Sequence, residues 1–178
     1  MTHIVHEDAL HRLTIVPMIA ALENLGKILH KAETHAAKEK IDPSVFLGAR
    51  LYPDMFSLIQ QLQYALFIPI DFAQHFANAP APKVGYEEAS FADVHASQKL
   101  AVGYLKSVLP ARMDERANLV VPIFFDPSQG LAAETYAAHM IMPDFHFHLT
   151  IAYAILRHNG VPLGKLDFIG ELATVKLG

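Results

Sequence analysis

The stretch ETYAAHMIMPDFHFHLTIAYAILRHNG, residues 134–160, combines a long helical apolar pattern with the densest group of polar side chains in the chain. Its apolar residues recur at spacings of three and four, as on one face of an amphipathic helix: Ile141, Phe145, Leu149, Ala152, Ile155 and Leu156. Asn159-Gly160 and the following Pro162 are typical of a helix end. Pro143 removes a backbone donor inside the pattern, which predicts a kink over 140–142. The stretch therefore predicts a kinked, core-facing last helix.

Asp144 and His148 are the polar residues of this stretch that share one helical face, because they are spaced i, i+4. Two such groups can hold a cation between them. Alternatively, the carboxylate only orients the imidazole inside a helical core. His146 lies two residues from each and is predicted to point elsewhere, toward the surface or an interface.

The length and composition indicate one domain over residues 1–178, because 178 residues with 52% hydrophobic content suffice for one core. Charged residues make up 18% of the chain and the mean hydropathy is +0.24, which favours a homodimer that hides apolar surface. The net charge is -4 and no Lys/Arg cluster is present. Nucleic acid and anionic membranes are therefore not expected partners.

The chain contains no cysteine, which excludes disulfides, thiolate metal sites and a cysteine nucleophile. Its N-terminus lacks the basic end and apolar run of a signal peptide, and no stretch approaches the length of an uninterrupted apolar membrane span. We therefore expect a cytoplasmic protein.

The remaining periodic stretches predict three more long helices, over about 8–40 with a disturbance at Pro17, over 55–78, and from the Ser90 cap to about 108. A short helix follows the Asp42-Pro43 cap. Residues 118–130 predict a short β-rich excursion, with Pro122 at a sheet edge. The fold class is therefore all-α, an up-down four-helix bundle with a crossover that carries a short β excursion before the last helix.

Bundles build sites from inward side chains of neighbouring helices, which directs attention to the second and last long helices. Gln60 and Gln63 flank the apolar stripe of the second long helix, which leaves two alternatives: at least one of them faces the interior, or both lie at the solvent edge. With Asp144 and His148 they would form a polar pocket for a metal, a water or a small substrate. His139 is a further candidate ligand-binding residue. Arg157 either binds an anion or complements the helix dipole.

The residues DFHFH at 144–148 and AYAILRHNGVPLG at 152–164 resemble the last helix of the DinB/YfiT-like superfamily of metalloenzymes. PDMF at 53–56, the Gln60/Gln63 helix and GKLDFIG at 164–170 resemble one branch of it, a domain-of-unknown-function family of bacterial and fungal proteins. The resemblance spans nearly the whole chain. It implies a DinB/YfiT-like up-down four-helix bundle, often dimeric, and for some members thiol transfer or thiol-dependent isomerisation on a divalent metal.

The superfamily's metal motif is one His on the second helix and H-x-x-x-H on the last. Matching the sequence to it places Asp144 and His148 at the last two ligand positions, for an ion such as Zn, Ni or Mn. In this chain, Asp144 stands where the motif has the first His of H-x-x-x-H, and the second helix has no His before His75.

Three hypotheses follow. In the first, the bundle binds a small molecule or an atypical metal, with Asp144 and His148 as a catalytic carboxylate/imidazole pair that moves a proton. In the second, the protein is a divalent-metal-dependent thiol transferase or isomerase. In the third, it is a non-enzymatic, dimeric structural or stress-related protein whose polar cluster only fixes helix register.

Overall fold

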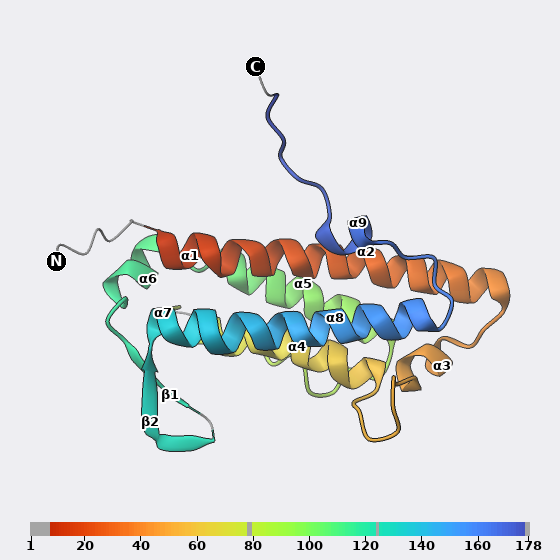
Figure 1. Cartoon of the computed structure of the whole chain (residues 1–178), viewed down its shortest axis with the longest axis horizontal. Coiled ribbons are helices and arrows are strands. Elements are labelled where there is room, and N and C mark those ends of the chain that lie inside the picture. Colours follow the sequence, from red (N-terminus) through yellow and green to blue (C-terminus); the bar gives the residue numbers. More distant parts are fainter. Residues whose placement is uncertain (1–7, 78–79, 124, 177–178) are drawn as a thin grey trace.

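Four long helices lie side by side in the computed structural model, which describes residues 8–77, 80–123 and 125–176 (Figure 1). They are α2 (Ile15–Glu39), α4 (Leu58–Gln74), α5 (Phe91–Lys106) and α8 (Met142–His158). Their buried apolar side chains form one continuous core, and α4 packs most extensively against α8. The predicted all-α four-helix bundle is confirmed.

The first predicted helix is divided into α1 (Ala9–Leu13) and α2, with the break at Thr14. Pro17 cannot donate a hydrogen bond to the carbonyl group four residues before it, and its ring crowds that carbonyl. The Thr14 hydroxyl donates to the Leu10 carbonyl at 2.6 Å, which satisfies a polar group at the break. Residues 9–39 are long and apolar enough to cross a membrane. However, 44% of their apolar 18-residue stretch is buried inside the bundle, as in a core helix.

The second long helix begins at Leu58, three residues later than predicted, because Ser57 and Gln60 form a capping box. The predicted end at Asn78 lies outside the described residues. Before it, α3 (Pro43–Gly48) starts at the predicted Asp42 cap, whose carboxylate accepts a hydrogen bond from the Ser44 amide at 2.9 Å.

The connection between α4 and α5 returns along the bundle, so that α4 and α5 run in the same direction, opposite to α2 and α8 (Figure 1). This return is fixed at the middle of α4, where the Gln63 amide donates to the Glu88 carbonyl at 2.9 Å. Gly85 adopts φ 85° against the same helix. α5 then begins at the predicted Ser90 cap, where Ser90 and Asp93 bond reciprocally.

After α6 (Pro110–Glu115) the chain forms an antiparallel hairpin of β1 (Val120–Ile123) and β2 (Asp126–Ala132) at one end of the bundle (Figure 1). This is the predicted β excursion; its residue 124 lies outside the described ranges. Pro122 pairs with Gly130. Both strands of this two-stranded hairpin are edge strands, where proline is tolerated.

The predicted kink before the last helix is a π-helical turn, η1 (Ala137–Ile141), between α7 (Ala133–Tyr136) and α8. Pro143 occupies the first turn of α8, where its missing N–H costs little, and the wider turn accommodates its ring. π-turns are frequent at functional sites, and this one immediately precedes Asp144.

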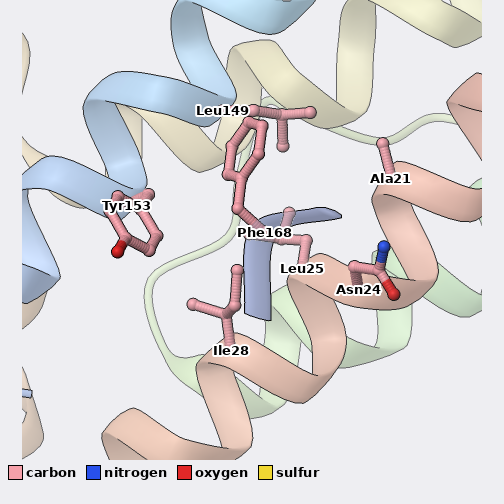
Figure 2. A pocket seen from close by; sticks show the side chains of 7 residues that line it. All are labelled: Ala21, Asn24, Leu25, Ile28, Leu149, Tyr153 and Phe168. Atoms are coloured by element: carbon pink, nitrogen blue, oxygen red, sulfur yellow. The ribbon is translucent and has the colours of Figure 1, made fainter. Parts of the chain in front are cut away.

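The C-terminal segment forms a short helix, α9 (Lys165–Ile169), which lies against α2. Figure 2 shows the Phe168 ring between α2 and α8, beside Leu149 and Tyr153. The Asn24 amide donates to the Ile169 carbonyl at 3.0 Å and holds this segment in place. The apolar hollow beneath it has a volume of about 10 Å³, too small for a ligand larger than a water molecule.

Candidate functional site

His148 and Asp144, hereafter the Asp144/His148 pair, lie on one face of α8 as their spacing predicts, with His148 Nε2 3.4 Å from Asp144 Oδ1. The two side chains differ in burial. His148 is 7% exposed and faces α4, whereas the Asp144 side chain is 47% exposed. The pair therefore joins a buried imidazole to a carboxylate at the surface.

The other ring nitrogen of His148 is held by Gln61 of α4, whose Oε1 lies 2.7 Å from Nδ1. An amide oxygen only accepts hydrogen bonds, so Nδ1 carries the proton and donates it. In the neutral ring, Nε2 then has a lone pair that faces the Asp144 carboxylate oxygen. Two acceptors cannot bond to each other, so a proton or an external donor is needed to join them.

Burial lowers the pKa of His148, and the opposing attraction of the Asp144 carboxylate does not reverse this effect. The pair therefore holds a neutral His148 imidazole at neutral pH, with Nε2 available to accept a proton. Burial also lowers the pKa of the nearby His146.

These shifts predict that the free energy of unfolding falls on acidification. The unfolded chain, in which a histidine has a pKa of about 6.5, binds protons before the folded one does. Stability is therefore complete above this value and is lost as the pH falls below it, with a slope of up to about 1.4 kcal/mol per pH unit for each histidine. Urea unfolding at several pH values measures this slope.

His148→Gln keeps a partner for Gln61 and is expected to reduce the slope. The control His158→Gln removes an exposed histidine of the same helix. Equal reductions in the two variants would contradict the assignment of the slope to the buried ring.

Aromatic side chains cover one face of the His148 ring. Tyr64 stacks on the imidazole with a centroid distance of 4.8 Å and an interplanar angle of 14°. Phe56 stacks in turn on Tyr64 at 5.2 Å. Tyr64 is 42% exposed and Phe56 39%, so these rings extend from the buried imidazole to the surface.

The two glutamines predicted to line the site are engaged elsewhere. Gln60 Oε1 accepts hydrogen bonds from the Ser57 amide and hydroxyl, both at 3.0 Å. Gln63 donates to the Glu88 carbonyl. The structure brings Gln61, which lies between them in the sequence, to His148.

The other predicted ligand-binding residues do not join the pair. His139 is exposed on η1, and within the described ranges no hydrogen bond or ion pair links it to Asp144 or His148. Arg157 is exposed in the last turn of α8, about 20 Å along the helix from Asp144 at 1.5 Å per residue. An anion bound at Arg157 would therefore lie in a separate site.

The sequence did contain a signal for Gln61. Leu58, Leu62 and Ala65 are fully buried, and Gln61 stands at i+3 from Leu58 on the same face. A polar residue inside an apolar stripe predicts a buried hydrogen bond. Tyr64 carries no such signal, because its stacking depends on how α4 and α8 pack.

Apart from the small volume beneath α9, a larger, open hollow of about 790 Å³ lies where the return connection meets α5, beside Tyr86, Glu88 and Ser97. Neither hollow is lined by Asp144 or His148. The pair reaches the surface through the Asp144 side chain, which is half-exposed.

The donor set does not fit the metal site that the resemblance implies. A catalytic divalent site of this kind uses three protein ligands and an open position. Within the described ranges, no group of three His, Cys, Asp or Glu side chains is arranged to hold a metal ion. The Oε1 atom of Gln61, which contacts His148, already accepts the hydrogen bond from Nδ1–H.

Comparison with known proteins agrees with this architecture. A crystal structure of a DinB family member protein from Shewanella denitrificans is similar, with a TM-score of 0.88 and 31% identity over 94% of this chain and 96% of that chain. No curated protein matched the sequence. Residues 10–169 match the family described as a domain of unknown function, DUF1993. The chain therefore belongs to the DUF1993 family and has a DinB-like fold.

Proposed function

We propose that the protein binds a small molecule at the Asp144/His148 pair and exchanges a proton with it. The observation that carries the proposal is the orientation of His148. Its Nδ1 proton is committed to Gln61, and its Nε2 lone pair faces the Asp144 carboxylate across 3.4 Å. A bound molecule with an N–H or O–H group would supply the donor that these two acceptors lack.

The pair has the parts of a general base. A proton leaving the bound molecule would form a bond to Nε2, and the Asp144 carboxylate would stabilise the resulting imidazolium. Gln61 would hold the ring in the tautomer that keeps Nε2 free, as orienting groups do for catalytic histidines. The half-exposed carboxylate leaves the molecule a path to the ring.

This proposal predicts that small molecules perturb the imidazole signals of His148. In a fragment screen by NMR on the full chain, we expect compounds with N–H or O–H groups to shift these signals saturably. In His148→Gln, the compounds should no longer shift the NMR signals of the residues around position 148, because the acceptor is removed. In the control His158→Gln, these signals should still shift.

The same protein samples distinguish the alternatives. Elemental analysis after incubation with zinc, nickel and manganese would support the thiol-transferase hypothesis if it found one ion per chain that His148→Gln removes. The absence of any fragment binding would instead favour a structural role for the cluster. The homodimer and the cytoplasmic location remain predictions.

A further inference from the structure

Apart from the Nδ1–H that donates to Gln61, the polar atoms of the Asp144/His148 pair accept hydrogen bonds or carry negative charge. The Asp144 carboxylate is 47% exposed, and the neutral His148 ring presents its Nε2 lone pair because Nδ1–H points to Gln61. A ligand at this position must therefore bring the donors.

The aromatic rings beside the pair are also electron-rich on their faces. Tyr64 and Phe56 lie nearly parallel to the His148 ring, at interplanar angles of 14° and 17°. Phe147, the residue before His148, is 54% exposed. Faces of Tyr and Phe rings attract cations, most strongly where water is partly excluded.

Among the described residues, no Lys or Arg side chain forms an ion pair with Asp144, and the group within ion-pair distance of it is His148. Arg50, which is close to the loop that carries Phe56, donates to the carbonyl groups of Pro53 and Met55 at 3.3 and 3.1 Å. The net charge of -4 also favours the approach of cations.

We propose that the ligand of this site is an organic cation, a protonated amine with an apolar or aromatic body. Its ammonium group would donate to the Asp144 carboxylate and to His148 Nε2, and its body would lie against the partly exposed side chains of Tyr64 and Phe56. This inference rests on the proposed function and adds the charge and shape of the ligand. It involves binding alone and requires no metal.

The test uses three probes of similar shape and different charge: benzylamine, benzyl alcohol and benzoate. Each is titrated at neutral pH and constant ionic strength into the full-length protein, while NMR follows the His148 and Tyr64 ring signals. We expect benzylamine to bind at least about tenfold more tightly than benzyl alcohol, and benzoate to bind most weakly.

Three variants locate the effect. Asp144→Asn keeps the shape of the side chain and removes its charge, so it should abolish the preference for benzylamine. The control Asp54→Asn removes an exposed carboxylate from the loop that carries Phe56 and should keep the preference. Tyr64→Leu should weaken all three probes, because it removes the stacking face.

The outcomes separate this inference from the proposed function. Binding of benzyl alcohol or benzoate as tight as that of benzylamine would overturn the organic-cation class and leave a small-molecule site. A preference for benzylamine that survives in Asp144→Asn, or falls equally in Asp54→Asn, would also overturn it. If no probe shifts the His148 signals in the folded parent protein, both proposals fail.

Discussion

Replacing Gly85 by alanine is expected to lower the free energy of unfolding by about 2–4 kcal/mol, combining the cost of a left-handed backbone with that of an overpacked contact. Gly85 has φ 85°, a conformation that side chains other than glycine rarely adopt. An added Cβ would also collide with the Gln63 carbonyl oxygen and lie 2.8 Å from Phe67 Cβ. Both neighbours belong to α4 and cannot move without disturbing the bundle.

Gly103→Ala is the matched control for this measurement. Gly103 lies within α5, where an added Cβ would meet no atom within 4 Å. Alanine has the higher helix propensity, so this variant should gain up to about 1 kcal/mol. Urea unfolding of both variants gives the comparison. Equal stabilities would show that the return connection does not press against α4 as described.

The features that the sequence predicted well are those decided by neighbouring residues. Ser90 caps α5 because its side chain and that of Asp93 bond to backbone groups three residues apart. Pro143 predicts a disturbed helix because the proline ring affects only the preceding turn, and the π-turn η1 is found there. The i, i+4 spacing likewise placed Asp144 next to His148.

The direction of α5 is a feature that no local pattern contains. The connection from α4 could have formed a tight turn, but it returns to the middle of α4, where Gly85 and Glu88 contact the helix. That path depends on contacts between residues far apart in the sequence, such as Gln63 with Glu88. The same dependence explains why Tyr64 was not predicted at the site.

The sequence directed attention to Gln60 and Gln63, whereas the glutamine that contacts His148 is Gln61. The difference comes from which apolar stripe of α4 is buried. α4 is rich in apolar residues on several sides, so a stripe through Phe56 and Ile59 fits the helical period about as well as the buried one. The Ser57 cap excludes Phe56 from the helix and leaves it 39% exposed. The buried stripe is therefore displaced, and Gln61 becomes the inward glutamine, 2% exposed.

Gln61→Leu is expected to destabilise the fold by about 1–3 kcal/mol, the usual cost of a buried polar group without a partner. Leucine has a similar size and an apolar side chain, so the packing of α4 is kept while the Nδ1 proton of His148 loses its acceptor. The control Gln74→Leu alters an exposed glutamine of the same helix, whose amide bonds to Asp71 at 2.6 Å. It should change stability by less than about 0.5 kcal/mol, as surface substitutions usually do.

The two variants Gln61→Leu and His148→Phe together separate the hydrogen bond from the packing. His148→Phe alone leaves the Gln61 amide without its partner, so each single change should be costly. The double variant buries two apolar side chains against each other and should recover much of the loss, because removing both partners is far less costly than removing one. Stability measurements on the four proteins give the coupling energy. Additive losses would show that Gln61 and His148 do not interact.

Gln61→Leu also distinguishes an orienting role from a purely structural one. Without the acceptor at Nδ1, the ring proton is free to move to Nε2, where it can bond to Asp144 Oδ1 at 3.4 Å. The ¹⁵N chemical shifts of the two His148 ring nitrogens report the tautomer directly. In this variant we expect Nε2 to show the shift of a protonated nitrogen and Nδ1 that of an unprotonated one. Because Nε2 would then be a donor, binding of amine probes should weaken even in samples that remain fully folded. Unchanged shifts and unchanged binding would show that Gln61 contributes to packing alone.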